Sequence, residues 1–494
     1  MSRRGWLLLG AFVAPLAIRT LWFYQGGYTR REPVSTPDYT ALRQASPPLG
    51  AAVSPAPPSP SADRVVLVDW AHQNRFDVTE LEVLGAALGA LGARFEVVSA
   101  GYDFSALPLE ERLKYAAAYV VAAPTQEFTT SEVQAVTRFV ERGGRLLVIS
   151  DPTRGSAFFD IFGFYGGPAF GDVAAANVLL APHDLAFSED YLYNLRRSEG
   201  NFRNVFLADF ADLPITQGLN EVALYGARSV RTRSGAPVLV GDGYTYSSRT
   251  DRGGDLAAAA LSPQGDALAL GDLTFLTPPY HEVADNGRLI LNLADFLLGG
   301  ERLRGLEDFP YLFTQNVEIV ESEALPLSAD HLLALAAAQD ALGPLGRQVR
   351  ISAAASEGLD HVEFALFDSA EDVQTTLEAL GVVLPADSDE NKLTLPGFPP
   401  FDPTGVGVLL VSHDEDGTTL IIMAETDADL QSTFDLVTRR DLSPCFVVGA
   451  AAICQVGAAD FGFEPNFDFT EPDITDFGTD LFLPTPTPFP IPTP

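Results

Sequence analysis

Strand patterns alternate with helix patterns between Val65 and Pro152, and this alternation constrains the fold more than any other feature of the chain. The first apolar run ends at Asp69, and leucines then recur at helical spacing over Leu81–Leu91. Continuous apolar runs of this length are typical of parallel strands that are covered on both faces. The expected strands are Val65–Asp69, Arg94–Ser99, Tyr115–Pro124 and Arg145–Pro152. The repeat predicts an α/β fold with a doubly wound, mainly parallel sheet and right-handed crossovers.

Capping-box patterns mark two expected helix starts in this region. Thr79 is followed three residues later by Glu82, and Thr129 is followed by Glu132 at the same spacing. Later elements are predicted as strands over Pro237–Asp242, Ala257–Pro263 and Ala267–Leu276, a hairpin turn at 264–266 and a helix over Asn286–Leu298. The aromatic-rich region 155–233 is expected to be irregular and to cover the carboxyl edge of the sheet.

A second folded region begins near residue 309 and has a different pattern. Two alternating runs within 405–426 flank Asp416 and Gly417, which predicts an antiparallel hairpin. Helices are expected over Ser328–Leu342, from Ser369 onward and over Asp427–Thr438. We therefore predict a smaller C-terminal α+β domain with an antiparallel sheet.

The first 29 residues carry the pattern of a membrane anchor. Arg3 and Arg4 precede a long apolar run, and Trp6–Tyr24 as a helix would span about 28 Å, close to the hydrocarbon thickness of a bilayer. Aromatic residues lie at both ends of the run, and Arg19 is near enough to one end to reach the interface. Because the run lacks a small-residue cleavage site, we predict a single uncleaved signal-anchor helix at the cell membrane, with the bulk of the chain extracytoplasmic.

Two further segments have biased compositions. Residues 30–62 contain eight prolines, as in a semi-rigid extended spacer. The stretch from Asp460 to Pro494 has seven acidic residues and no basic one, which is typical of a disordered tail. The predicted organisation is a transmembrane anchor at 1–29, a linker at 30–62, an α/β domain at 63–308, an α+β domain at 309–457 and a tail at 458–494.

Composition argues against several partners and cofactors. The formal net charge is −35, whereas phosphate binding requires clustered Lys and Arg, so we expect no nucleic-acid partner. No glycine-rich phosphate loop follows the first strand, and we expect no cofactor. Cys445 and Cys454 lack the further ligands of a zinc site, and we expect no metal. Outside the cytoplasm these cysteines could form a disulfide, and otherwise they are two buried thiols.

Three segments also resemble a known family: Asp69–Val98, Phe128–Pro152 and Leu268–Gly299. They resemble domain-of-unknown-function family 4350 of bacteria and archaea, which is similar to the class I glutamine amidotransferase-like superfamily with its flavodoxin-like sheet. They are also similar to the extracytoplasmic part of gliding-motility-type ABC transporter auxiliary proteins. The resemblance covers about residues 64–300 and implies a fold far more than a function.

Polar side chains follow the expected strands at their carboxyl ends, where open α/β sheets bind ligands. These residues are Asp69, His72, Asn74, Thr125, Asp151 and Asp272. Carboxylates, an imidazole and an amide in one crevice could bind a polar small ligand, or a divalent cation through oxygen. In the alternative interpretation, Asp69 and Asn74 cap the helix start and fasten the loop, and the histidine is only hydrogen-bonded.

The resemblance to amidotransferase-like enzymes implies a nucleophile on the sharp turn after the fourth strand. That turn contains Ser150 and no cysteine, and Val148 and Pro152 stand where small residues are needed. His281 is followed by Glu282 at the expected position of the base and its acid, so a catalytic Ser150, His281 and Glu282 arrangement can be drawn. The alternative is a degenerate site in which Ser150 makes turn hydrogen bonds.

These patterns together predict a membrane-anchored, extracytoplasmic binding or interaction protein whose amidotransferase-like domain is catalytically degenerate. Its expected partners are the membrane, through the N-terminal helix, and either a protein or a polar small ligand. Two alternatives stay open. One is a hydrolase that acts at the strand-end crevice, and the other is an accessory subunit of an ABC-type transporter.

Overall fold

The computed structural model describes most of the chain between the predicted linker and the predicted tail. The described residues are 3–21, 64–99, 107–154, 173–250, 253–320, 336, 338–340, 342–343, 347–388, 392–414, 417–439 and 441–457. The linker at 30–62, all of the expected tail at 458–494 and most of the helix expected over Ser328–Leu342 lie outside them. The chain divides into two compact units, Met1–Pro57 and Pro58–Pro494.

The first unit contains one described helix, α1 (Arg3–Leu21), with Pro15 inside it. Among the residues that the structure describes, no helix is both long enough and apolar enough to cross a membrane. Trp22, Phe23 and Tyr24 of the expected anchor lie outside the described range, and the anchor stays a prediction.

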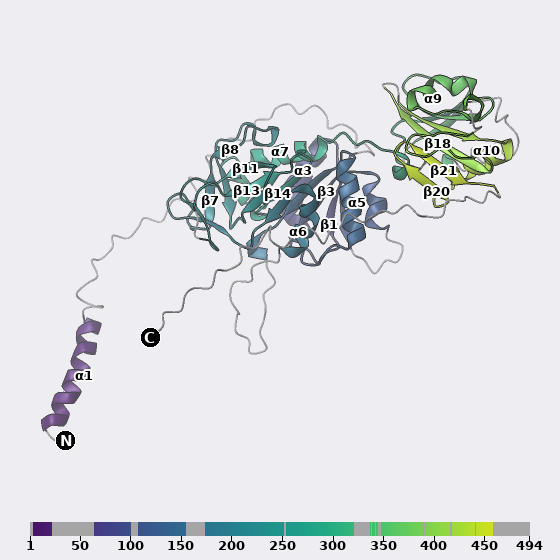
Figure 1. Ribbon diagram of the computed structural model, residues 1–494. Helices are drawn as coiled ribbons and strands as arrows, with labels where there is room; N and C mark the ends of the chain where they lie inside the picture. Colours follow the sequence, from purple (N-terminus) through teal and green to yellow (C-terminus); the bar gives the residue numbers. More distant parts are fainter. Residues whose placement is uncertain are drawn as a thin grey trace. The chain divides into compact units, whose positions relative to one another are not determined.

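The second unit begins with a ten-stranded sheet (Figure 1). Five neighbouring strands are parallel, in the order β2 (Arg94–Ser99), β1 (Val65–Trp70), β3 (Ala116–Ala122), β4 (Arg145–Ile149) and β14 (Ala267–Leu270). Antiparallel strands extend it, namely β13 (Ala257–Leu261), β10 (Val230–Thr232), β5 (Leu185–Phe187), β11 (Ala236–Val240) and β8 (Asp209–Phe210). The predicted α/β class with a parallel-rich sheet is confirmed. We call the line where β1, β3, β4 and β14 end the carboxyl edge.

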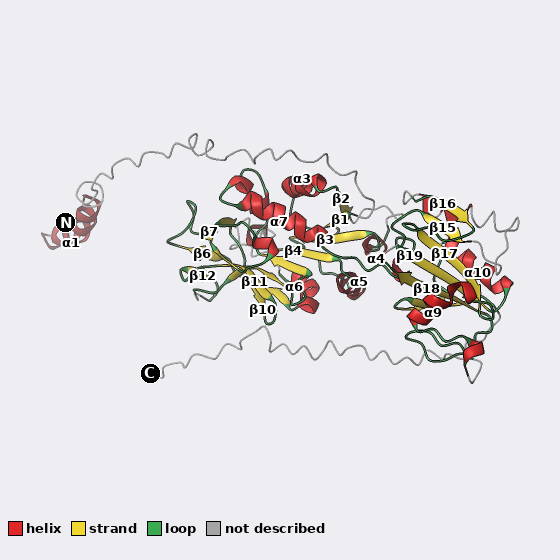
Figure 2. Ribbon diagram, turned by 90° about the horizontal axis from the view of Figure 1, so that it is seen from above, coloured by secondary structure: helices red, strands yellow, loops and turns green. Residues whose placement is uncertain are grey.

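Helices cover both faces of this sheet (Figure 2). Successive side chains of a strand point to opposite sides, so the continuous apolar strands present apolar side chains to the helices on both faces. On one face Val66 and Val68 of β1 share a core cluster with α3 (Glu82–Ala90) and α7 (Asn286–Leu298). On the other face Val65 and Leu67 share a cluster with α4, α5 and α6. These helices span Leu109–Leu113, Thr130–Glu141 and Ala174–Leu180.

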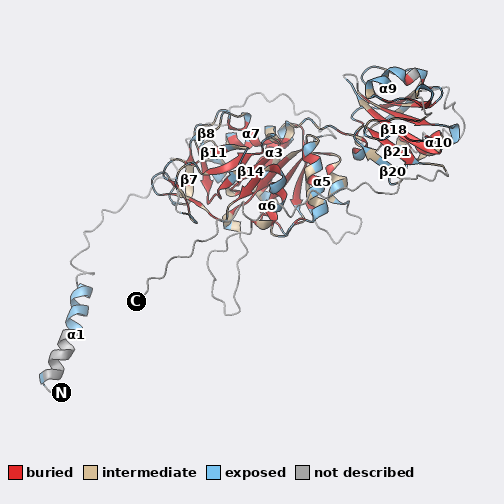
Figure 3. Ribbon diagram, viewed as in Figure 1, coloured by how far each residue is buried: buried red, intermediate tan, exposed pale blue. Residues whose placement is uncertain are grey.

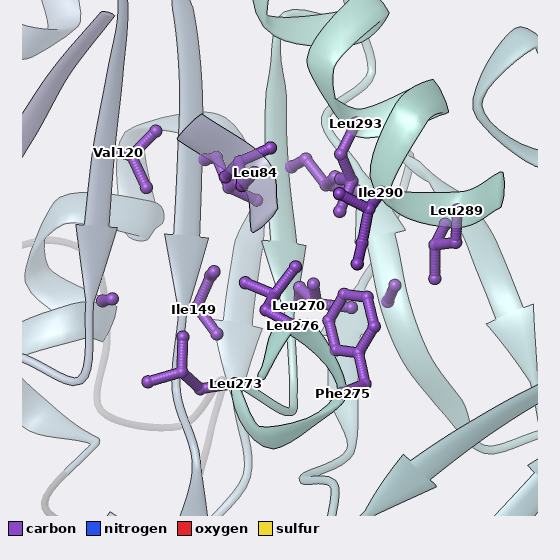
Figure 4. Packing of buried hydrophobic residues seen from close by; sticks show 14 of the residues in the cluster. Leu84, Val120, Ile149, Leu270, Leu273, Phe275, Leu276, Leu289, Ile290 and Leu293 are labelled. Atoms are coloured by element: carbon purple, nitrogen blue, oxygen red, sulfur yellow. The ribbon is translucent and has the colours of Figure 1, made fainter. Parts of the chain in front are cut away.

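The face covered by α7 has a tightly interdigitated core (Figure 4). Leu289, Ile290 and Leu293 of α7 are at most 2 % exposed and belong to the same cluster as Ile149 and Leu270 of the strands below. Truncating one such leucine to alanine costs about 2–5 kcal/mol of folding free energy. This core holds the strand ends in place and therefore positions the carboxyl edge.

The region 155–233 is more regular than its sequence indicates, wherever it is described. Two small antiparallel sheets involve it: β6 (Leu192–Asn194) with β12 (Thr245–Ser247), and β7 (Asn204–Leu207) with β9 (Val222–Tyr225). Strands of three or four residues are too short to give a periodic signal, which explains why the expectation of irregular structure was wrong here.

A second, seven-stranded sheet follows and is mixed, which corrects the expectation of an antiparallel sheet. Its order is β16 (Val349–Ser352), β15 (Val317–Val320), β17 (Asp360–Leu366), β19 (Thr418–Ala424), β18 (Val406–His413), β21 (Ala451–Gln455) and β20 (Cys445–Val448). The first four strands are parallel neighbours, and only the β19–β18–β21–β20 side is antiparallel. The hairpin expected within 405–426 is present as β18 and β19, and it set the wrong expectation for the whole sheet.

Helices also cover both faces of the second sheet, and its central strands β17, β19, β18 and β21 are mostly buried (Figure 3). Leu430, Phe434 and Val437 of α10 (Asp427–Thr438) pack in one cluster, and Leu377 of α9 (Gln374–Leu380) packs in the other. Cys445 and Cys454 lie opposite each other on β20 and β21 and form a disulfide, with their Cα atoms 4.0 Å apart.

One predicted helix start is wrong by two residues. The capping box before α3 is formed by Asp77 and Glu80, not by Thr79 and Glu82, and it caps a 3₁₀ turn over Val78–Leu81 that leads into α3. Thr79 instead donates its backbone N–H to Asp77 Oδ1 over 2.9 Å. At α5 the predicted box is confirmed, with Thr129 as the cap.

Candidate functional site

Polar residues from four neighbouring strands gather at the carboxyl edge. Asp69 is the fifth residue of β1, and the loop after β1 carries His72 and Asn74. Thr125 follows β3, and its backbone N–H donates to the carbonyl oxygen of His72 over 3.0 Å. The other two candidates, Asp151 and Asp272, follow β4 and β14. All six residues predicted from strand ends are therefore at one edge, because their strands are parallel neighbours.

Asp69, His72 and Glu132 form a connected group, which we call the His72 cluster. The Nδ1 atom of His72 lies 2.9 Å from Asp69 Oδ1 and 3.0 Å from Oδ2. Its Nε2 atom lies 3.5 Å from Glu132 Oε1, in the first turn of α5. Phe128 stacks on the imidazole with ring centroids 3.7 Å apart. The ring is thus held between two carboxylates and covered by an aromatic side chain.

This surrounding favours the protonated imidazole. Burial opposes the charge of His72, but the hydrogen bond with Asp69 and the charges of Asp69 and Glu132 outweigh it and raise the pKa of His72 above its ordinary value. Burial would raise the pKa of Glu132, yet hydrogen bonds from Thr129 and the charge of His72 lower it. Burial, followed by the charge of Asp69, raises the pKa of the nearby Tyr119 well above its ordinary value. The cluster is an internal salt bridge more than a free general base.

Asn74 and Thr125 fasten the loop after β1. Asn74 Oδ1 accepts the backbone N–H of His72 over 3.0 Å, and its Nδ2 donates to the carbonyl oxygen of Ala122 over 2.8 Å. The Thr125 hydroxyl donates to the carbonyl oxygen of Gln73 over 2.8 Å, and Gln73 has a positive φ of 50°. These bonds hold a strained turn in place.

Asp151 and Asp272, which we call the acid pair, are almost completely buried. Asp151 Oδ1 accepts the backbone N–H and the hydroxyl of Thr153 over 2.7 and 2.6 Å. Its Oδ2 accepts the Leu273 N–H over 3.2 Å and the Thr274 hydroxyl over 3.1 Å. Asp151 therefore ties the turn after β4 to the turn after β14.

Asp272 holds two further backbone groups. Its Oδ2 accepts the Tyr225 N–H over 2.7 Å and its Oδ1 accepts the Thr274 N–H over 2.9 Å. Burial, together with the adjacent charge of Asp151, raises the pKa of Asp272 to about 8. Burial and the charge of Asp151 therefore favour the protonated form of Asp272 at neutral pH.

The catalytic arrangement drawn from the resemblance is not assembled in this structure. Ser150 is 4 % exposed, and its backbone N–H donates to Leu270, but within the described residues no hydrogen bond joins its hydroxyl to His281. His281 Nε2 lies 3.9 Å from Glu282 Oε1, beyond hydrogen-bond distance, and its buried Nδ1 has no hydrogen-bond partner in the described part of the chain. Neither contact of a nucleophile–base–acid chain is therefore made.

Part of the edge was not predicted from the sequence. Glu132 was expected only as part of a helix cap, and Phe128 and Tyr119 were not expected at the edge. The position of Glu132 could have been predicted. If β1 and β3 are parallel neighbours, α5, which follows β3, begins beside the carboxyl end of β1, and Glu132 lies in its first turn. In the described part of the chain, no group of three or more His, Cys, Asp or Glu side chains is arranged to hold a metal ion.

Comparisons with known proteins give partial likenesses only. No family model matches the chain, and no curated protein matches it. The N-terminal domain of mmIFT52 aligns over 47% of this chain and 97% of its own, with 14% identity and a TM-score of 0.38. A ThuA-like protein from Bacteroides uniformis aligns over 49% and 93%, with 13% identity and a TM-score of 0.30. A cytoplasmic protein from Salmonella typhimurium aligns over 47% and 98%, with 14% identity and a TM-score of 0.29. These likenesses assign neither a fold family nor a function to this chain.

Proposed function

We propose that this chain is a membrane-anchored, extracytoplasmic interaction protein whose α/β domain is a structural core and not an enzyme. One observation carries the proposal: the polar residues of the carboxyl edge are already engaged with one another and with backbone groups. Asp69 contacts His72, and Asp151 accepts four hydrogen bonds. A hydrolase needs a nucleophile with a positioned base, and Ser150 has no such contact among the described residues.

The proposal includes a finer fold assignment. The parallel order β2-β1-β3-β4-β14, with helices on both faces, supports a doubly wound, flavodoxin-like domain. That arrangement fits the resemblance to domain-of-unknown-function family 4350 and to the class I glutamine amidotransferase-like superfamily. A degenerate turn at Ser150 fits a member of such a fold that uses it as a scaffold.

An activity screen tests the non-catalytic part of the proposal. Ester, amide and glutamine substrates are incubated with the full chain and with Ser150→Ala and His281→Ala variants. We expect equal background rates for all three proteins. A rate of the unmodified chain that falls at least about a hundredfold in both variants would establish a nucleophile–base pair and overturn the proposal.

A fractionation experiment tests the anchor separately. The apolar run around Leu8 and Phe12 supports insertion, and a charge near the middle of a spanning helix is costly. We expect the full chain in the membrane fraction and a Leu8→Arg, Phe12→Arg variant in the soluble fraction. Equal partitioning of the two proteins would contradict the predicted membrane anchor. It would not affect the proposal that the α/β domain is a structural core.

A further inference from the structure

Tyrosines recur with a period of two on the small sheet of β6 and β12. Tyr193 of β6 and Tyr246 of β12 are paired in register. Tyr191 and Tyr244 lie two residues earlier, and side chains two apart along an extended segment point to the same side. The neighbouring Leu192 is fully buried, as are the other residues next to the paired tyrosines on these two strands, so the tyrosines occupy the outer side.

Rings on this side contact one another and are open to solvent. Tyr193 stacks on Tyr246 with centroids 5.6 Å apart and meets Phe202 edge-on at 6.2 Å. Phe202 is 43% exposed and Tyr244 is 45% exposed. Contiguous exposed aromatic surface on a soluble domain marks an interaction site more often than an accident of packing. We call this surface the aromatic–arginine face and define it by Tyr193, Arg196, Phe202, Arg203, Tyr244 and Tyr246.

Two arginines of the face are stacked on rings. The guanidinium carbon of Arg196 lies 3.6 Å from the centroid of Tyr244, and that of Arg203 lies 4.1 Å from the centroid of Tyr191. Within the described residues neither guanidinium makes a hydrogen bond or an ion pair with a carboxylate. A guanidinium over a ring keeps its N–H donors in its own plane, where their edges stay free to bind a carboxylate bidentately.

Two neighbouring arginines, in contrast, form ion pairs with carboxylates. Arg197 pairs with Glu221 and Arg249 pairs with Glu189, each at 2.5 Å. The chain has 66 acidic and 31 basic residues, so carboxylates that could pair with an arginine are abundant. Among the described residues, the face therefore presents two guanidinium groups without a carboxylate partner beside exposed rings, a composition that recurs at protein interfaces.

The same chain contains a segment of complementary chemistry. Residues 460–482 hold seven acidic residues, six phenylalanines and no basic residue. Phenylalanine and carboxylate alternate closely within Phe461–Glu471. Aromatic side chains of this segment match the exposed rings, and its carboxylates match the stacked arginines.

We propose that the aromatic–arginine face binds the acidic, phenylalanine-rich segment 460–482 of the same chain. The segment's carboxylates pair with Arg196 and Arg203, and its phenylalanines pack against Phe202 and Tyr244. Docking covers the exposed rings. This inference stands on different residues from the proposed function and does not require it.

Site-specific photo-crosslinking in the full-length chain tests the docking. Benzoylphenylalanine replaces Phe469, between Asp468 and Glu471, and in a matched control it replaces Phe489, which lies beyond the last acidic residue. We expect crosslinks from position 469 to peptides that contain Phe202 or Tyr244, within a single chain, and few from position 489. Raising the salt concentration should lower the yield, because the contact is between exposed charges.

Charge reversal identifies the partners. Arg196→Glu with Arg203→Glu should lower the crosslink yield at least about tenfold, whereas the charge-matched control Arg94→Glu with Arg439→Glu should not. Asp468→Arg with Glu471→Arg tests the same contact with the face intact, which covers a failure of the first variant to fold. Combining both reversals should restore the crosslink. Crosslinks that fall elsewhere, that join two chains, or that survive both reversals would overturn the proposal.

Discussion

The His72 cluster and the acid pair lie at the same edge and bury carboxylates in opposite ways. Asp69 is fully buried against an imidazole whose protonated form its environment favours. Asp272 is fully buried beside a second carboxylate, and its pKa rises to about 8. One group is neutralised by a cationic side chain and the other by a proton. An edge built in this way stabilises loops, and each half should respond differently to substitution and to pH.

Removing the carboxylate of Asp272 from the acid pair should have the largest effect on stability. Asp272→Ala leaves the N–H groups of Tyr225 and Thr274 buried without a partner, at about 1–3 kcal/mol each. We expect a loss of about 3–5 kcal/mol in the free energy of unfolding. Urea titration followed by Trp70 fluorescence measures it, because Trp70 ends β1 at this edge and the other tryptophans, Trp6 and Trp22, can be changed to Phe.

An exposed aspartate gives the matched control for this loss. Asp212→Ala should change the free energy of unfolding by less than about 0.5 kcal/mol. A cost of Asp272→Ala below about 1 kcal/mol would mean that the acid pair does not fasten the edge.

The pH dependence of the free energy of unfolding tests the raised pKa of Asp272. The pKa of Asp272 is about 8 in the folded chain and about 3.9 in the unfolded chain, so the folded state holds more protons between these values. The free energy of unfolding should therefore decrease as the pH rises from 4 to 8. Asparagine cannot titrate, so the free energy of unfolding of Asp272→Asn should not follow this decrease. The difference in the free energy of unfolding between the unmodified chain and Asp272→Asn should therefore be about 2–3 kcal/mol smaller at pH 9 than at pH 6. Parallel curves for the two proteins would contradict the raised pKa of Asp272.

The His72 cluster should respond more weakly. In Asp69→Asn the carboxylate charge is lost, so burial dominates and the pKa of His72 should fall below its ordinary value. A raised pKa in the unmodified chain contributes stability below about pH 6.5 that is lost as the pH rises through the folded value. We expect Asp69→Asn to lower the free energy of unfolding by about 1–2 kcal/mol at pH 6 and by less at pH 9. NMR titration of the imidazole, assigned with His72→Gln, measures the pKa, and an unchanged value would contradict the cluster.

Strand-end positions could be predicted from the sequence, but the bonds made there could not. The apolar runs that end at Asp69 and Asp151 were enough to place both carboxylates at one edge, because parallel strands end together. Their partners depend on loop paths that periodicity does not encode. Asp77 with Glu80 and Thr79 with Glu82 satisfy the same spacing rule, and only the 3₁₀ turn over Val78–Leu81 selects the first pair.

The mixed second sheet and the aromatic–arginine face were missed for a related reason. The β18–β19 hairpin is a local signal, whereas the parallel pairing of β17 with β19 joins residues as far apart in the chain as His361 and Thr419. The tyrosines of β6 and β12 are likewise brought together from distant segments. Non-local pairing determines both features, and a single sequence carries little direct signal for it.

The smallest expected effect separates the two carboxylates of the His72 cluster. Glu132 caps α5 through the Thr129 N–H over 2.8 Å and also faces His72 at 3.5 Å. Glutamine keeps the capping geometry and removes only the charge, so Glu132→Gln should cost less than about 1 kcal/mol, while Glu132→Ala should lose the cap as well. The pKa of His72 should fall less in Glu132→Gln than in Asp69→Asn, because Asp69 is closer and fully buried whereas Glu132 is partly exposed. Equal shifts in the pKa of His72 in the two variants would contradict this difference and would make Asp69 and Glu132 equivalent partners of the imidazole.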